Sequence, residues 1–408
     1  MKGKILMKQL FKDYSTNINN PKWENCISRV NPLYARNSDL RSEFERDCAR
    51  IIHSNSYRRL KHKTQVFFSP ENDHICTRIE HVTHVESISY TIAKYLGLNT
   101  ELTKAIAVGH DLGHSPFGHC GEKILSKCSE KDLGIKFWHE KNGLDFVDYI
   151  ELLEDCNLNK QNLNLTYAVR DGIISHCGEI DENCLKPRDE FINLSEYSYP
   201  NQFAPYTWEA CVVKISDKIS YIGRDIEDAI SLGILDNHLE DLYELLNLHS
   251  SEDKINNTVI INKLVADICK NSTPEKGLCF SAEAFDLMNK IKEFNYKHIY
   301  FSERINPSIR FSELVINEIY NKLKSTFEGN STLQNIKSLE KFYPKLSKSF
   351  YGFLSNYCDF ENRDSLKLQN KIIFDIENEK DFIKAILYYI SGMTDNFAME
   401  IYNEIIRF

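Results

Sequence analysis

The stretch TRIEHVTHVESISYTIAKYLGLNTELTKAIAVGHDLGHSPFGHCGE, residues 77–122, contains five of the chain's 13 histidines. Within 78–96, apolar residues recur at steps of three and four, as one buried helix face requires: Val82, Val85, Ile88, Ile92 and Tyr95. Gly97 is a suitable end for this helix, and Asn99 or Thr100 is a suitable N-cap for the next. The second helix carries LTKAIAVGHDL and breaks at GHSPFG. The stretch therefore predicts two consecutive helices followed by a sharp break.

Three side chains of this stretch are candidate metal ligands. His110 and Asp111 stand where the second helix ends, and adjacent residues can serve one site only at such an end. An imidazole and a carboxylate make a mixed N/O donor set that suits Mn, Fe, Zn or Mg. His81 opens the first helix and can approach the pair from an antiparallel neighbour. A lone histidine is most often a core or surface residue, but this grouping favours a metal site.

A long periodic run near residues 208–229 supplies the fourth candidate ligand. Its apolar residues follow helical spacing: Trp208, Cys211, Val212, Ile215, Ile219, Ile222, Ile226 and Ala229. A polar stripe beside them carries Asp217, Tyr221 and Asp225 at i, i+4 and i+8. Taken alone, such a stripe is usually a solvated face with ion pairs. An aromatic residue and a carboxylate in register with Asp217 favour a site wall, with Asp217 as the missing ligand.

His119 and Glu122 form a candidate catalytic pair. They lie three residues apart at the start of a predicted helix, so the carboxylate can orient and charge the imidazole. A histidine held in this way is suited to act as a general acid or base. His114 and His139 are further candidate donors, although a capping or packing role explains His139 nearly as well.

Cationic side chains flank these candidates in the sequence: Arg58, Arg59, Lys61, Lys63, Arg78, Lys214 and Lys218. Runs of charge are usually solvated surface, but a cationic site around a metal is what a polyphosphate needs. The chain has no Walker-type glycine-rich loop, so phosphate binding would depend on side chains. The residues alone therefore predict a metal-dependent phosphohydrolase.

The bulk composition limits the class of protein. The net charge of -9 argues against a purely electrostatic nucleic-acid binder, so nucleic acid is at most a secondary partner. No apolar run approaches the ~18 residues of a membrane span, and the first residues lack an apolar signal core. The twelve cysteines are scattered. We therefore expect a cytoplasmic protein with reduced thiols and no membrane contact.

Several sequence blocks resemble one known family. The order of His81, His110–Asp111 and Asp217 resembles the HD superfamily of metal-dependent phosphohydrolases. The blocks RDCARIIHSNSYRRLKHKTQVF, TRIEH, HDLGHSPFGHCGE, KISDKISYIGRDIEDAI and SGMTDNFAMEIY are similar to the deoxyguanosinetriphosphate triphosphohydrolase family. A mammalian dNTPase that joins a sterile-alpha-motif domain to an HD domain is a more distant relative. The blocks span nearly the whole chain, and their order is far more specific than the HD pair.

The resemblance implies an all-α HD-domain phosphohydrolase fold with additional C-terminal helices. The division expected is an N-terminal extension over 1–40, an HD core over 41–236, and a C-terminal helical region over 237–408. That region would pack on the core and on partner subunits, because relatives are ring-shaped homo-oligomers, often hexamers or tetramers. The sparse strand signals agree with a mainly helical chain.

The resemblance also implies a reaction, which is hydrolysis of dGTP or another dNTP to deoxynucleoside and inorganic triphosphate. The implied metal ligands are His81, His110, Asp111 and Asp217, holding Mn²⁺ or Mg²⁺, with Fe, Co, Ni or Zn as further options. His119, oriented by Glu122, would move the proton, with His114 as a further catalytic candidate.

Six residues match substrate-binding positions of the family. His139, Arg78 and Lys218 match residues that contact or neutralise the phosphates. Tyr221 matches a tyrosine that packs on the sugar and would exclude a ribose 2′-hydroxyl. Gln65 and Asp225 match residues that bind the 3′-hydroxyl.

Two alternatives remain open. The first is another HD phosphohydrolase acting on a nucleoside monophosphate or a cyclic nucleotide; Tyr221 and the Gln65 block argue against it. The second is a regulator that binds nucleotide or nucleic acid without turnover. The complete ligand set and the His119–Glu122 pair argue against that reading.

Overall fold

The structure is a computed structural model, and it describes residues 9–33, 40–68, 72, 74–177, 183–246 and 257–407. These residues form seventeen α-helices and one two-stranded antiparallel sheet. The all-α fold class is confirmed.

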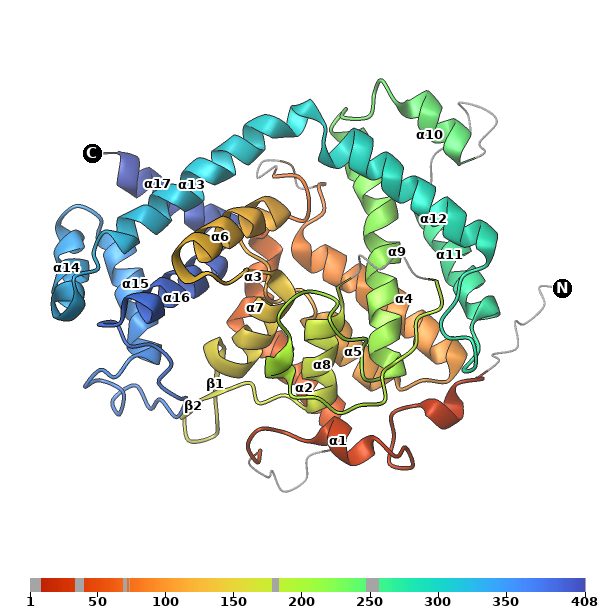
Figure 1. Cartoon of the computed structure of the whole chain (residues 1–408), viewed down its shortest axis with the longest axis horizontal. Coiled ribbons are helices and arrows are strands. Elements are labelled where there is room, and N and C mark those ends of the chain that lie inside the picture. The colour runs from red at the N-terminus through yellow and green to blue at the C-terminus, as the bar shows by residue number, and fades with distance from the viewer. Residues whose placement is uncertain are drawn as a thin grey trace.

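The helices up to Ser231 and the turn after Gly109 contain every predicted metal ligand, and Figure 1 shows how these helices are arranged. They are α1 (Trp23–Ile27), α2 (Glu43–His53), α3 (Asn55–Arg59), α4 (Arg78–Leu96), α5 (Thr100–Gly109), α6 (Gly118–Leu133), α7 (His139–Asp145), α8 (Tyr167–Ser175) and α9 (Trp208–Ser231). The π-helix Phe146–Ile150 continues α7, and β1 (Leu152–Glu154) pairs with β2 (Lys160–Asn162).

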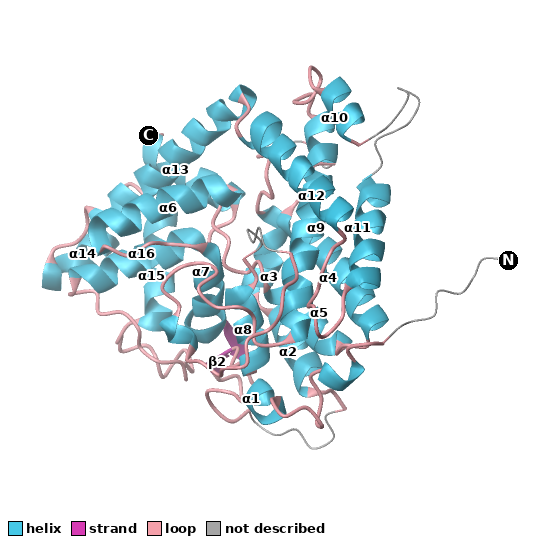
Figure 2. Ribbon diagram, turned by 45° about the vertical axis from the view of Figure 1, so that its right-hand side comes forward, coloured by secondary structure: helices cyan, strands magenta, loops and turns pink. Residues whose placement is uncertain are grey.

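The second half adds further helices on two sides of α9. They are α10 (Leu239–Leu245), α11 (Asn257–Asn271), α12 (Ala282–Asn295), α13 (Asn306–Lys324), α14 (Thr332–Ser338), α15 (Pro344–Tyr357), α16 (Glu379–Ser391) and α17 (Asp395–Ile406). A π-helix, η5 (Tyr296–Tyr300), continues α12. Figures 1 and 2 both place α11 and α12 beside α4 and α9, whereas α14–α17 lie with α6 and α13 on the opposite side.

Three hydrophobic clusters hold these helices together. One joins α2, α5 and α8, the second joins α4 and α9 to α11 and α12, and the third joins α6 to α13–α17. Phe11 is fully buried in the second cluster and packs edge-on against Trp208. The second cluster thus contains residues from all three predicted segments. The division at 40 and 236 stays a prediction.

The local predictions from helix periodicity agree closely with the structure. Helix α4 begins and ends at the expected residues, Gly97 terminates it with a left-handed φ of 85°, and the Asn99 side chain caps α5. The helical segment that begins with α7 ends at Ile150, and Leu152 then enters the sheet opposite Asn162.

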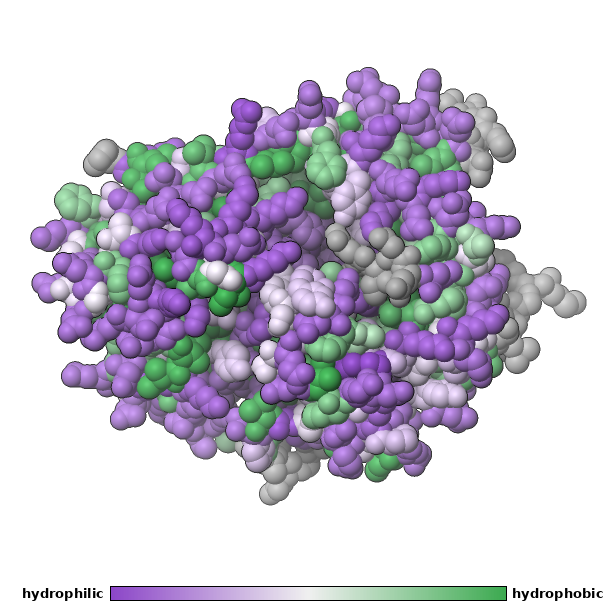
Figure 3. Space-filling view, viewed as in Figure 1, coloured by the Kyte–Doolittle hydropathy of each residue, from purple (hydrophilic) through white to green (hydrophobic). Residues whose placement is uncertain are grey.

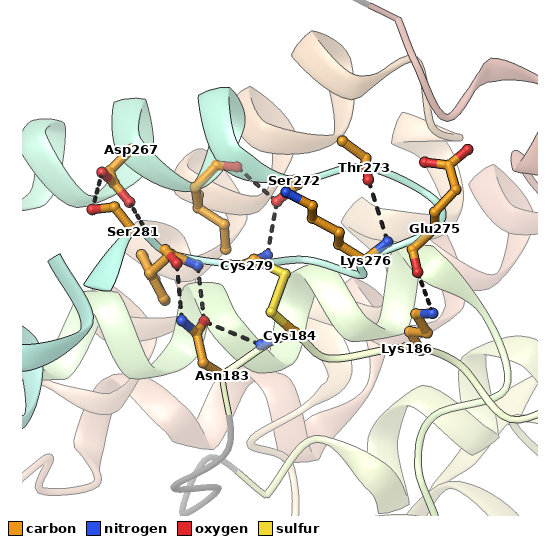
Figure 4. The surroundings of a disulfide bond; sticks show 12 residues. Asn183, Cys184, Lys186, Asp267, Ser272, Thr273, Glu275, Lys276, Cys279 and Ser281 are labelled. Atoms are coloured by element: carbon orange, nitrogen blue, oxygen red, sulfur yellow. Dashed lines mark hydrogen bonds between the residues drawn. A yellow bond between two sulfur atoms is a disulfide. The ribbon is translucent and has the colours of Figure 1, made fainter. Parts of the chain in front are cut away.

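One disulfide contradicts the expectation that all thiols are reduced. Cys184 is bonded to Cys279 (Figure 4). Backbone pairing between Leu185 and Leu278 brings the two cysteines together, with N···O distances of 3.1 and 2.9 Å. The Asn183 side chain adds two hydrogen bonds to Phe280. The segment between α8 and α9 is thereby attached to the turn between α11 and α12, a pairing across 95 residues that no local pattern reveals.

The outer surface agrees with the composition. The face in Figure 3 is mostly hydrophilic, with small groups of apolar side chains between the polar ones. None of the described helices is long and apolar enough to cross a membrane.

Candidate functional site

Helix ends and one long helix position the four predicted metal ligands. His81 lies in the first turn of α4, which Thr77 and Glu80 close with a reciprocal capping box. His110 is the residue at which α5 ends, and Asp111 follows it in the turn. Asp217 comes from the middle of α9, which packs against both α4 and α5. Three elements therefore bring these side chains to one point.

The distances between the four side chains are those of one cluster. His81 Nε2 lies 2.9 Å from Asp217 Oδ1 and 3.7 Å from Asp111 Oδ2. His110 Nε2 lies 3.5 Å from Asp111 Oδ1 and 3.9 Å from Asp217 Oδ1. The nearest donor atoms of His81, His110 and Asp217 all lie within 4.8 Å of one another. The donor atoms of His81, His110 and Asp217 can thus meet at one cation, and Asp111 adjoins them beside His110.

The environment of His110 fits a metal ligand. Its Nδ1 lies 2.7 Å from the Ala107 carbonyl oxygen, which can only accept, so Nδ1 carries the proton. Nε2 is then left with its lone pair, and it is fully buried without a hydrogen-bond partner among the described residues. A buried nitrogen without a partner is costly unless another group meets it. The donor chemistry and this orphaned atom both fit a divalent cation.

The two carboxylates of the cluster are held in their charged forms. Burial raises the pKa of Asp111, but the neighbouring imidazoles and the Arg78 guanidinium together hold that pKa well below its usual range. Burial also raises the pKa of Asp217, and the hydrogen bond and charge of His81 more than offset it, so the net pKa is lowered. A charged carboxylate is the form that binds a metal.

His176 also belongs to this cluster, although the sequence patterns did not identify it as a candidate ligand. It ends α8, its Nδ1 lies 2.7 Å from the Ile173 carbonyl oxygen, and its donor atom lies within 4.8 Å of those of His110 and Asp111. Burial, and after it the neighbouring His110, lowers the pKa of His176 to about 4. Like His110, His176 lies at the end of a helix, and this position was the signal that the sequence offered. In the structure both rings contact the carbonyl oxygen three residues earlier.

Glu122 connects two histidines beside the metal cluster. Its carboxylate lies 3.3 Å from His119 Nδ1 and 3.1 Å from His139 Nδ1, and it accepts the His139 backbone N–H at 2.9 Å. Burial lowers the pKa of His139, but Glu140 and Glu122 outweigh it and raise that pKa to about 10. Burial likewise raises the pKa of Glu122, which the two imidazoles hold well below its usual range. The pair expected from spacing is thus part of a triad in which Glu122 bridges His119 and His139.

His114 lies between this triad and the metal cluster. Its ring stacks on His139 with centroids 3.9 Å apart, and its Nε2 lies 3.0 Å from Asp111 Oδ1. Burial, followed by the charge on Arg78, lowers the pKa of His114 well below its usual range. A neutral imidazole therefore links the two groups of side chains.

Arg78 is buried and already has several partners. Its guanidinium donates to Asp111 Oδ2 at 3.1 Å and to the carbonyls of Thr64 and Gln65 at 3.1 and 2.9 Å. Of the other cations, Arg59 pairs with Glu151, and Lys63 donates to two backbone carbonyls. These cations stabilise the structure around the site through their contacts. For Arg78 to bind a phosphate, it would have to add a contact or give up one of its present hydrogen bonds.

Two residues expected at the sugar end have a free buried oxygen. Gln65 Oε1 and Asp225 Oδ1 are buried and have no hydrogen-bond partner among the described residues. The other Asp225 oxygen accepts from the Tyr300 hydroxyl of η5, a contact missed in the sequence. Burial raises the pKa of Asp225 to about 7. Both oxygens are suited to meet a hydroxyl group.

Lys218 and Tyr221 follow Asp217 along α9. Lys218 is buried and lines a small cavity together with Cys184 and Leu278, next to the Cys184–Cys279 disulfide. Tyr221 is half-buried and packs against the cluster that joins α9 to α11 and α12. Their expected contacts with phosphates and sugar stay predictions.

Comparison with known proteins identifies the family. The family model of the HD domain matches residues 78–222. A deoxyguanosinetriphosphate triphosphohydrolase-like protein of Rickettsia bellii is 32% identical over 381 residues, covering 90% of this chain and 92% of the relative. Proteins of the same name are 33% identical in Rickettsia prowazekii, over 92% of this chain and 93% of the relative, and 32% identical in Caldanaerobacter subterraneus, over 90% and 86%.

These matches confirm the resemblance seen in the sequence blocks and cover nearly the whole chain rather than the HD region alone. They also support a hydrolase, and its His and Asp clusters have the donor atoms to bind a metal. The chain belongs to the deoxyguanosinetriphosphate triphosphohydrolase-like family of HD-domain proteins.

Proposed function

We propose that this protein hydrolyses dGTP, and with it other dNTPs, to the deoxynucleoside and inorganic triphosphate. The observation that carries the proposal is the convergence of three groups of side chains. Arg78 and His114 connect the metal cluster to the His119–Glu122–His139 triad, and Arg78 also donates to the backbone carbonyl of Gln65. The two free oxygens belong to the side chains of Gln65 and Asp225. The names of the relatives point to the same reaction.

The ligands proposed for the cation are His81, His110, Asp111 and Asp217, and His176 is a reserve donor. When bound, a divalent cation offsets the charge that develops at the α-phosphate and makes water more acidic. Mn²⁺ or Mg²⁺ suits the carboxylates best, and Fe, Co, Ni or Zn suits the imidazoles.

The proton-transfer role is proposed for His119. Its side chain is 63% exposed, so a substrate can reach it, while Glu122 orients the ring from the buried side. His119 would protonate the departing 5′-oxygen, or direct the attacking water. His139, held as a cation by the two glutamates, would attract the phosphates together with Lys218 and Arg78.

The protein would contact the sugar at both its 3′ and its 2′ positions. Gln65 and Asp225 would bond the 3′-hydroxyl, because each has a buried oxygen without a partner. Tyr221 would pack on the sugar and leave no room for a 2′-hydroxyl. These contacts make a deoxynucleotide the preferred substrate and GTP a poor one.

Product analysis tests the reaction. Each dNTP and GTP is incubated with Mn²⁺ or Mg²⁺, and the products are separated by anion-exchange chromatography. We expect deoxynucleoside and intact triphosphate, with dGTP preferred and GTP spared. Monophosphate and pyrophosphate would place the attack at a different bond and contradict the proposal.

We further propose a cytoplasmic homo-oligomer, a hexamer or a tetramer, with nucleic acid as a secondary partner at most. The resemblance to a family of ring-shaped homo-oligomers supports this proposal. Size-exclusion chromatography with light scattering measures the assembly, and a monomer at micromolar concentration would contradict it.

A further inference from the structure

The block SGMTDNFAMEIY has no role in the site described above. It forms the end of α16 and the start of α17, and it contains the buried Asp395. One Asp395 oxygen accepts from the backbone N–H of Thr64 at 2.8 Å and from the Thr64 hydroxyl. The other accepts from the backbone N–H of Phe117 at 2.9 Å. A single carboxylate of the C-terminal region therefore bonds two loops of the HD core.

The two loops lead into different parts of the site. Thr64 precedes Gln65, which carries one of the free oxygens at the sugar end. Phe117 precedes Gly118 and His119, which begin α6. Phe117 has a left-handed φ of 61°, a conformation that residues with a side chain rarely adopt and that needs support from its surroundings.

The loops approach each other closely where Asp395 joins them. A Cβ atom on Gly118 would lie 3.0 Å from the Gln65 carbonyl oxygen, so a larger residue would push the loops apart. Lys63 fastens the same junction by donating to the carbonyls of His114 and Ser391. The loop before α4, the break before α6 and the turn before α17 thus meet at one buried point.

We propose that Asp395 is a positioning residue that holds Gln65 in place relative to His119. It thereby fixes the group that would bind the 3′-hydroxyl relative to the group that would transfer the proton. The inference rests on the proposed function for the roles of those two residues. It gives the C-terminal helices a part in substrate recognition within a single chain, because Asp395 lies 331 residues from Thr64 in the sequence.

The test substitutes Asp395→Asn, which keeps the size of the side chain. An amide has one acceptor oxygen, so in either orientation one backbone N–H, of Thr64 or of Phe117, is left without an acceptor. We expect kcat/KM for dGTP to fall at least about tenfold, the equivalent of one hydrogen bond to a charged group. The preference for dGTP over its 3′-deoxy analogue, ddGTP, should fall at least about threefold, because Gln65 no longer meets the 3′-hydroxyl.

Glu209→Gln is the matched control. Glu209 is fully buried and accepts from the same kinds of donor as Asp395, two backbone N–H groups and a threonine hydroxyl, which here belong to Thr16 and Asn99. None of these donors adjoins Gln65 or His119. A loss of stability like that of Asp395→Asn, with the preference for dGTP over ddGTP unchanged, separates positioning from a general loss of packing.

Hydrogen exchange gives a second measurement that needs no substrate. Peptides covering 63–68 and 114–119 should lose protection in Asp395→Asn and keep it in Glu209→Gln. Unchanged protection in both segments, an unchanged preference for dGTP over ddGTP, or an equal change in the Glu209 variant would each overturn the proposal. If wild-type protein releases no deoxynucleoside, the proposed reaction fails, and the exchange result still decides the role of Asp395.

Discussion

Replacing Glu122 by Gln should lower the pKa of His139 and make the protein less stable. Glu122 accepts the backbone N–H of His139 and contacts the Nδ1 atoms of both His139 and His119. The amide can keep the backbone hydrogen bond through its oxygen, but it removes the negative charge. His139 would then keep Glu140 as its remaining close carboxylate, at 3.4 Å.

The size of the effect follows from the pKa of His139. A histidine in the unfolded chain has a pKa of about 6.5, whereas that of His139 in the fold is about 10. This difference corresponds to at most about 5 kcal/mol. Burial opposes it, the charge of Glu140 favours it, and Glu122 favours it through both its charge and its hydrogen bond. We therefore expect the loss of Glu122 to lower the pKa by at least about one unit, or ~1–2 kcal/mol.

The sign of the pH dependence follows from the direction of the shift. Because the folded pKa is the higher one, the folded state binds more protons than the unfolded state between about pH 6.5 and about pH 10. The stabilisation is therefore fully present below about pH 6.5 and is lost as the pH rises through about 10. In Glu122→Gln that loss should begin at a lower pH.

The assay is an NMR titration of the histidine Cε1 protons, combined with urea unfolding at pH 6, 8 and 10. Glu130→Gln is the matched control, because Glu130 lies on the same helix and accepts a hydrogen bond from Ser126 rather than from either histidine. A pKa of His139 in Glu122→Gln within about 0.3 of the wild-type value would refute the reasoning, since one pKa unit is expected.

Three further predictions concern the metal, the sugar and the disulfide. His110→Ala should remove about one divalent cation per chain and lower turnover at least about a hundredfold, measured by metal analysis and product release, whereas the exposed His62→Ala should change neither. Tyr221→Ala should reduce the preference for dGTP over GTP at least about tenfold; equal kcat/KM ratios in the variant and the wild type would exclude the proposed 2′ gate. Cys184→Ser should lower the free energy of unfolding by ~2–4 kcal/mol under oxidising conditions and not after reduction. Cys156→Ser, which removes an exposed free thiol, serves as its control. A loss of stability in Cys184→Ser that persists in reductant would show that packing, not the cross-link, is responsible.

The sequence by itself determined the helices and indicated most members of the cluster of histidines and aspartates proposed to bind the metal. The bounds of α4 follow from its apolar period and from Gly97, both of which act within one or two turns. Asp217 was identified by its register with Tyr221 and Asp225 on one helix, which again is local geometry. His110 and Asp111 stood out because a helix end brings adjacent side chains to one site.

Only the tertiary structure decided how distant segments meet. His176 reaches His110 because α8 packs against α5, and Glu122 reaches His139 because α7 returns beside the start of α6. The bonds of Asp395 to Thr64 and of Cys184 to Cys279 join residues far apart in the chain. Periodicity and capping depend on neighbours along the chain, whereas these contacts depend on the packing of whole helices, and no single sequence pattern specifies that packing.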